Sequence, residues 1–199
     1  MLTIYHAPRT RSLRLVWLCE EMGLPYEVRP ETFGQPSAEF LDANPLGAFP
    51  GFRDGEVRMG ESTAIMQYIT ERYGPTPLAL KADHPRFADY LQFVTFGEAS
   101  LAAYMNPVIA TQFGAPEGQR DNFTTEAAKS MFIRRLGAVE KQLEKGDYLA
   151  GDFTAADISV GYALGLGAAF GLTDRYPSTV ADYHARLNAR PALQAAMTK

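Results

Sequence analysis

Residues 2–29 read LTIYHAPRTRSLRLVWLCEEMGLPYEVR, and this stretch determines the fold of the N-terminal part of the chain. Residues 2–7 are β-prone and predict a strand. Over residues 12–23 apolar side chains recur at helical spacing, and Gly23 is a suitable residue to end a helix. Residues 26–29 predict a second short strand. Two strands joined through a helix are expected to be parallel.

The following residues extend this pattern. Residues 36–40 predict a short helix. Residues 49–52 and 57–59 flank RDGE at 53–56, and an Asp-Gly pair between β-prone runs predicts a hairpin. Residues 62–73 predict another helix. The expected order is therefore β-α-β-α-β-β-α, and the sheet is expected to be mixed.

The second part of the chain has a different pattern. Three prolines and no periodicity in residues 75–85 predict a linker. We therefore expect one domain at 1–76, a linker at 77–85 and an all-helical domain at 86–199. The helices are expected at 85–112, 121–145, 154–170, 178–189 and 191–197.

One helix of the second domain has a strong start signal. Thr154 and Asp157 have the spacing of a capping box, and Phe153 and Ile158 that of a hydrophobic staple. The helix that follows is apolar nearly all round, which predicts a central position.

Composition excludes several classes of protein. Of 199 residues 46% are hydrophobic and 21% charged, as in a folded globular chain, and the net charge of −4 does not favour nucleic acid or anionic membranes as partners. A single cysteine, Cys19, permits neither an intrachain disulfide nor a dithiol redox pair. With no apolar run for a signal peptide or membrane span, we expect a cytoplasmic protein. The three histidines lack metal-ligand spacing, so no metal is expected.

Several segments together resemble the cytosolic glutathione transferases. They are NPLGAFP at 44–50, the Glu61-Ser62 pair and the capped helix start at 153–158. LVWLCEEMGLPYE at 15–27 and GESTAI at 60–65 look like the bacterial members in particular. The resemblance implies a thioredoxin-like first domain with a four-stranded sheet and glutathione as co-substrate. It also implies a hydrophobic acceptor site between the domains and a homodimer.

The resemblance implies which residues bind glutathione. Ser62 and the amides at the start of its helix would hold the γ-glutamyl carboxylate, and Glu61 would pair with the amine. Ser62 also suits a simple N-cap. Phe49-Pro50 occupies the position of a cis-proline whose preceding residue pairs with the cysteinyl unit, although most X–Pro bonds are trans.

The catalytic requirement is a donor that favours the thiolate over the thiol, whose ordinary pKa is near 8.5. The bacterial pattern places this donor at Thr10, and Ser12 is the second candidate. Tyr5 is a third, because some classes have a tyrosine at the end of the first strand. The alternatives are helix capping by Thr10 or Ser12 and simple packing by Tyr5.

The remaining contacts depend on fewer observations. Arg11 could stabilise a thiolate or bind the ligand backbone, and Gln35 could donate an amide to the glycyl carboxylate. Phe96 and Tyr104, with Phe93 and Met105, are candidates for the acceptor site, although aromatics at helical spacing are usually core.

We therefore expect a glutathione transferase that attacks a hydrophobic electrophile in detoxification. An isomerase, dehalogenase or peroxidase using the same thiolate is an alternative. A non-catalytic module of the same fold that serves in protein interaction or regulation is another.

Overall fold

The computed structural model describes residues 1–199 and divides into two compact units. The first unit comprises Met1–Ala79 together with Asn188–Lys199, and the second comprises Leu80–Leu187. The C-terminal segment, Asn188–Lys199, thus belongs to the first unit. The local sequence patterns do not indicate that the end of the chain packs with its beginning.

The first unit contains the mixed four-stranded sheet that the sequence predicts. Its order is β2-β1-β3-β4, with β1 parallel to β2 and antiparallel to β3, and β3 antiparallel to β4. The β3–β4 hairpin turns at Gly55, whose φ of 59° suits glycine. The strands are β1 (Leu2–His6), β2 (Tyr26–Pro30), β3 (Gly51–Asp54) and β4 (Val57–Met59).

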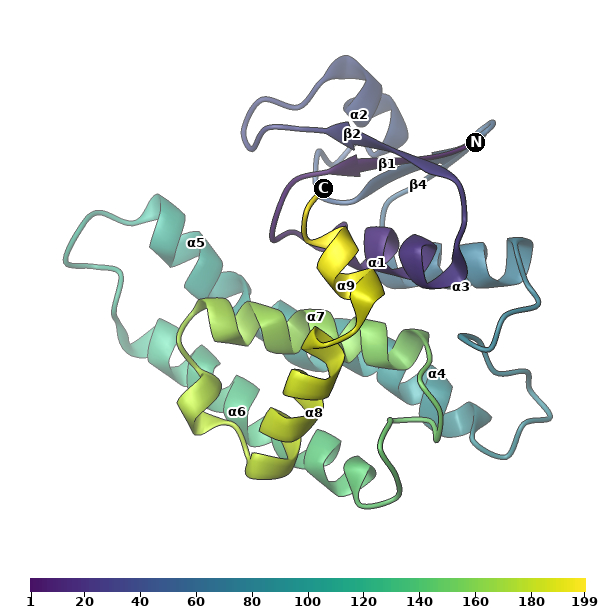
Figure 1. Ribbon diagram of the computed structural model, residues 1–199. Coiled ribbons are helices and arrows are strands. Elements are labelled where there is room, and N and C mark those ends of the chain that lie inside the picture. The colour runs from purple at the N-terminus through teal and green to yellow at the C-terminus, as the bar shows by residue number, and fades with distance from the viewer. The chain divides into compact units, whose positions relative to one another are not determined.

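Helices cover both faces of this sheet (Figure 1). Helices α1 and α3 pack together on one face, and α2 lies on the other. The last helix, α9, packs against α1, where Arg190 and Glu21 form an ion pair with Nε 2.6 Å from Oε1. The bounds are α1 (Leu13–Met22), α2 (Ala38–Ala43), α3 (Ser62–Arg72) and α9 (Pro191–Ala196).

The second unit is helical, and α7 (Ala155–Ala169) is its most buried element. The predicted capping box is confirmed, because the Thr154 side chain caps the helix and Asp157 Oδ2 accepts from the Thr154 amide at 2.8 Å. Asp157 also accepts from the Leu149 amide at 3.0 Å and the Tyr183 hydroxyl at 2.7 Å, so it joins three segments. None of the helices is long and apolar enough to cross a membrane.

The continuous helix predicted at 85–112 is wrong, because the structure interrupts it. A π-helical turn and a 3-10 turn separate α4 from α5. Ser159 donates to the Val94 carbonyl at 2.7 Å, and Gly97 packs directly on Ser159. A side chain that donates a hydrogen bond to a backbone carbonyl of a helix disturbs the regular series of backbone hydrogen bonds in that helix. The segments are α4 (Phe87–Phe96), η1 (Gly97–Leu101), η2 (Ala102–Met105) and α5 (Asn106–Gly114).

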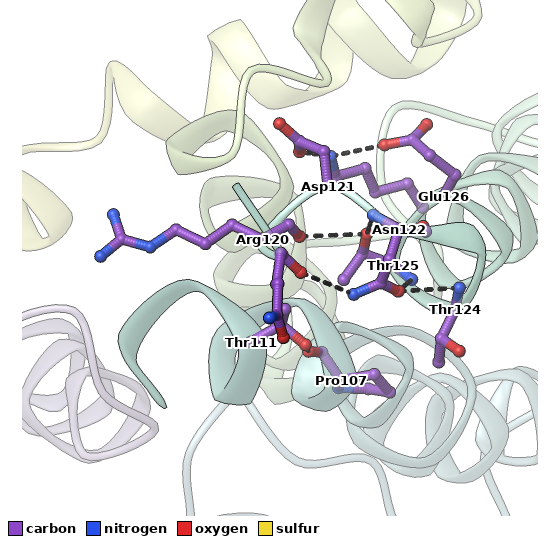
Figure 2. Close-up of polar contacts among 10 residues, drawn as sticks. Pro107, Thr111, Arg120, Asp121, Asn122, Thr124, Thr125 and Glu126 are labelled. Atoms are coloured by element: carbon purple, nitrogen blue, oxygen red, sulfur yellow. Dashed lines mark hydrogen bonds and ion pairs between the residues drawn. The ribbon is translucent and has the colours of Figure 1, made fainter. Parts of the chain in front are cut away.

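The link between α5 and α6 has its own polar network (Figure 2). Asn122 caps α6 by accepting from the Thr124 and Thr125 amides at 2.9 and 3.1 Å, and Thr125 closes a second capping box. This box was not predicted, because Asn122 and Thr125 depart from the usual Ser or Thr followed by Glu or Gln. The remaining elements are α6 (Phe123–Leu143), η3 (Thr173–Arg175) and α8 (Ser178–Asn188).

Candidate functional site

A chain of three side chains lies between the end of β1 and the start of α1. His6 Nδ1 lies 2.8 Å from Ser12 Oγ, and Ser12 Oγ lies 2.6 Å from Thr10 Oγ1. The Thr10 hydroxyl donates to the Ala7 carbonyl at 2.7 Å. The structure therefore brings both predicted serine and threonine candidates into one hydrogen-bonded chain, with a histidine that the sequence did not assign.

The three side chains differ in exposure. Ser12 is 0% exposed, His6 3% and Thr10 7%, so Thr10 is the member nearest the surface. Ser12 occupies the N-cap position of α1 but makes no side-chain capping bond, and the Thr10 hydroxyl donates to a preceding carbonyl. The Thr10 hydroxyl oxygen also accepts from the Ser12 amide at 3.4 Å, so helix capping does not account for the Ser12 hydroxyl, whereas Thr10 makes one contact with the backbone just before α1.

Tyr5 points away from this chain of hydroxyls, because successive side chains of a strand face opposite sides of the sheet. Its ring stacks on Phe40 of α2, with centroids 5.7 Å apart, and it is 1% exposed. Arg53 donates a hydrogen bond to the Tyr5 hydroxyl and has its own pKa raised chiefly by that contact. The packing alternative therefore describes Tyr5, and we leave it out of the proposed site.

The start of α3 combines a strained, exposed residue with a buried one. Glu61 is exposed and has φ 39° and ψ 91°, outside the usual regions for a residue with a side chain. Ser62 is 3% exposed and is the first residue of α3 rather than its N-cap. Its hydroxyl accepts from Arg14 Nη1 at 3.0 Å.

Arg14 is a residue of the candidate site to which the sequence assigned no specific role. It lies on α1, is 0% exposed, and joins the starts of α1 and α3 through Ser62. Arg14 lies three and four residues before Trp17 and Leu18, so helical spacing places it on the apolar side of α1, and this was the sequence signal of a buried arginine. A buried guanidinium requires hydrogen-bond acceptors, and these fix the position of its neighbours.

The loop before β3 has the predicted cis bond between Phe49 and Pro50. Asn44 supports this loop, because its amide donates to the carbonyls of Ala48 at 2.6 Å and Pro50 at 3.1 Å. The Phe49 ring stacks on Phe40 with centroids 4.9 Å apart. The loop that contains the cis bond is thus fixed by hydrogen bonds from Asn44 and by the packing of Phe49 on Phe40.

The other predicted contacts lie at varied depths. Arg11 is half-buried, and Gln35 is exposed in the loop before α2. Phe96 and Tyr104 are half-buried in the second unit, whereas Phe93 and Met105 belong to its core. The Tyr104 hydroxyl accepts from Arg135 Nη2 at 2.7 Å.

The chain's own thiol is unsuited to nucleophilic chemistry. Cys19 is completely buried on α1, and burial raises its pKa to about 12. A thiol of that pKa is almost wholly protonated at neutral pH. Any reacting thiolate at this site must therefore come from a bound molecule.

Comparison with known proteins identifies the family. Residues 1–71 match the glutathione S-transferase N-terminal domain, and residues 103–199 match the C-terminal domain. A probable glutathione S-transferase GSTF1 of Oryza sativa subsp. japonica is 30% identical over 214 residues, covering 94% of this chain and 91% of that protein. Glutathione S-transferase 1 of Triticum aestivum is 32% identical over 168 residues, covering 77% and 73% respectively. The chain belongs to the glutathione S-transferase family.

Solved structures show the same fold. The glutathione transferase URE2P6 from Phanerochaete chrysosporium, in complex with oxidized glutathione, has a TM-score of 0.85 and 26% identity, covering 99% of this chain and 94% of that one. A glutathione transferase from Methylococcus capsulatus has a TM-score of 0.84 and 25% identity over 100% of this chain and 98% of that one. The thioredoxin-like first domain and helical second domain are therefore confirmed.

Proposed function

We propose that the chain is a glutathione transferase that binds glutathione on its first unit and delivers the thiolate to a hydrophobic electrophile. The observation that carries the proposal is the hydroxyl pair at the start of α1, together with Ser62 at the start of α3. Arg14, on α1, donates a hydrogen bond to Ser62 at the start of α3. This bond links the helix start proposed to bind the glutathione thiol to the one proposed to bind the γ-glutamyl group.

The start of α3 suits the γ-glutamyl group. The first amides of a helix lack intrahelical partners and carry a partial positive charge, which favours a carboxylate. Ser62 adds a hydroxyl whose position Arg14 fixes, and the exposed Glu61 carboxylate can pair with the ligand amine. Phe49, on the supported cis-proline loop, is proposed to pair with the cysteinyl backbone.

Thr10 is our first choice as thiolate donor, and Ser12 acts behind it. Thr10 keeps 7% exposure, whereas Ser12 is wholly enclosed and cannot touch a ligand without rearrangement. A hydroxyl that donates to sulfur stabilises the thiolate relative to the thiol, and the helix start adds to the effect. Arg11 and Gln35 are proposed to contact the glutathione backbone, and Phe96 and Tyr104 the electrophile.

We also propose that the chain acts as a cytoplasmic homodimer in detoxification, on the basis of the family resemblance. In that role the electrophile carries a group that the thiolate displaces, so that a carbon–sulfur bond forms and the leaving group departs with its electron pair.

Calorimetry combined with a turnover assay tests the proposal. We expect glutathione to bind and cysteinylglycine, which lacks the γ-glutamyl group, to bind far more weakly. Ser62→Ala should weaken glutathione binding about tenfold, since one hydrogen bond to a charged group is lost. Turnover of a chlorodinitrobenzene should follow glutathione binding. Absence of binding at millimolar glutathione would instead favour a non-catalytic interaction module.

A further inference from the structure

The hydrogen bonds around Thr10 determine where their hydrogens lie. The Ala7 carbonyl can only accept, so the single Thr10 hydroxyl hydrogen serves that contact. The Thr10–Ser12 contact of 2.6 Å must then use the single Ser12 hydrogen. The remaining contact, 2.8 Å between Ser12 Oγ and His6 Nδ1, needs a third hydrogen, which only the imidazole can supply. The imidazole is therefore protonated on Nδ1.

From this count we infer that His6 is a positioning residue, which acts through Ser12 to keep the Thr10 hydroxyl a donor toward the glutathione sulfur. The inference rests on the proposed function for its ligand and goes beyond it, because it assigns a role to a side chain that does not touch glutathione.

The direction of the relay matters because Thr10 has one hydrogen and two possible uses for it. While His6 donates to Ser12 and Ser12 donates to Thr10, the Thr10 hydrogen is available to Ala7 or to a bound sulfur. If the His6 donor is removed, the contact between the hydroxyls can reverse, and Thr10 can donate to Ser12. Thr10 then presents a lone pair to the sulfur, which favours the thiol.

The surroundings of His6 hold the imidazole in this role. His6 is the last residue of β1, and its carbonyl accepts from the Glu31 amide at 2.8 Å, so the backbone is fixed beside β2. The side chain is 3% exposed. Burial lowers the pKa of His6 and so favours the neutral imidazole, and the count of hydrogens above places its one hydrogen on Nδ1.

The first experiment reads the hydrogen directly and needs no ligand. Nitrogen-15 NMR of the histidine rings distinguishes the Nδ1-protonated from the Nε2-protonated tautomer. We expect the Nδ1 form for His6 in the free protein, assigned by comparison with His6→Asn. An Nε2-protonated ring would overturn the inference, even if the protein proved not to bind glutathione.

The second experiment measures the pKa of the bound glutathione thiol by ultraviolet absorption of the thiolate. His6→Asn keeps an amide donor near the Nδ1 position, whereas His6→Leu has similar bulk and no donor. We expect the pKa of the bound thiol to stay close to wild type in His6→Asn. In His6→Leu we expect this pKa to rise by about one pH unit, because the free energy of one hydrogen bond corresponds to a change of that size.

A double variant separates this role from simple packing. In His6→Leu/Ser12→Ala the competing acceptor for the Thr10 hydrogen is gone, so the thiol pKa should fall back toward the wild-type value. A merely structural role for His6 predicts no such recovery. Equal thiol pKa values in His6→Asn and His6→Leu, with glutathione bound to both, would refute the relay. Failure of the wild-type chain to bind glutathione would refute the proposed function instead.

Discussion

Removing the Thr10 hydroxyl tests the thiolate donor most directly. Thr10→Val keeps the shape of the side chain and deletes the hydrogen. A hydrogen bond to a charged group is worth about 1.5–3 kcal/mol. In the free protein the same hydrogen bonds the Ala7 carbonyl, which also accepts from the Thr10 amide at 3.3 Å, so leaving that carbonyl costs only about 0.5–1 kcal/mol. The net stabilisation of the thiolate is about 1–2 kcal/mol.

Because one pKa unit corresponds to 1.36 kcal/mol, Thr10→Val should raise the pKa of the bound thiol by about one. The assay is a pH titration of thiolate absorption in the saturated complex, repeated as a pH profile of kcat/KM with a chlorodinitrobenzene. At a pH below the thiol pKa of both proteins, kcat/KM should fall about tenfold.

Two matched variants make this result specific. Thr10→Ser retains the hydroxyl and should keep the thiol pKa near the wild-type value. Tyr5→Phe should also keep it, because the Tyr5 phenol faces Arg53 and Phe40 on the other side of the sheet. A wild-type thiol pKa in Thr10→Val, or a rise in Tyr5→Phe, would show that Thr10 is not the donor.

Three further predictions concern stability, each measured by denaturant or thermal unfolding. Asp157→Ala should lower the free energy of unfolding by about 3–5 kcal/mol, because it removes a cap and leaves buried donors from two other segments unpaired; a loss below 1 kcal/mol would contradict this. Burial lowers the pKa of His6 below its ordinary 6.5, so its contribution to stability is complete above that pH and is lost as pH falls toward the folded-state pKa, a loss that His6→Asn should reduce. Gly97→Ala should destabilise by about 2 kcal/mol or more, since its Cβ would lie 2.6 Å from the Ser159 carbonyl oxygen, whereas Gly165→Ala on the open side of α7 should stabilise by about 0.5–1 kcal/mol.

The features that the sequence predicted well are those that local chemistry determines. The strand–helix–strand unit follows from periodicity and from Gly23, which ends α1 with φ 61°. The capping box at Thr154 and Asp157 depends on residues three apart. In both cases the partners are near neighbours in the chain, so a short window contains the whole interaction.

The features that the sequence did not predict depend on distant partners or on depth. Arg14 and Ser62 are separated by 48 positions, and nothing local pairs them. The interruption after α4 depends on Ser159, 65 positions from the carbonyl it takes. The sequence ranked Thr10 before Ser12 as thiolate donor from the family resemblance alone, and it could not show that Thr10 is 7% exposed whereas Ser12 is 0% exposed.

Backbone strain gives independent support for the two helix starts as the site. Arg9 and Glu61 are the non-glycine residues with positive φ, at 65° and 39°. Such conformations cost about 1–3 kcal/mol each and persist where the surrounding structure enforces them, often at functional sites. Arg9 immediately precedes Thr10, and Glu61 immediately precedes Ser62. Each of these two proposed contacts is hydrogen-bonded to a buried side chain, Thr10 to Ser12 and Ser62 to Arg14. The positive-φ residues Arg9 and Glu61 therefore lie directly before the two helix starts at which we propose that glutathione binds.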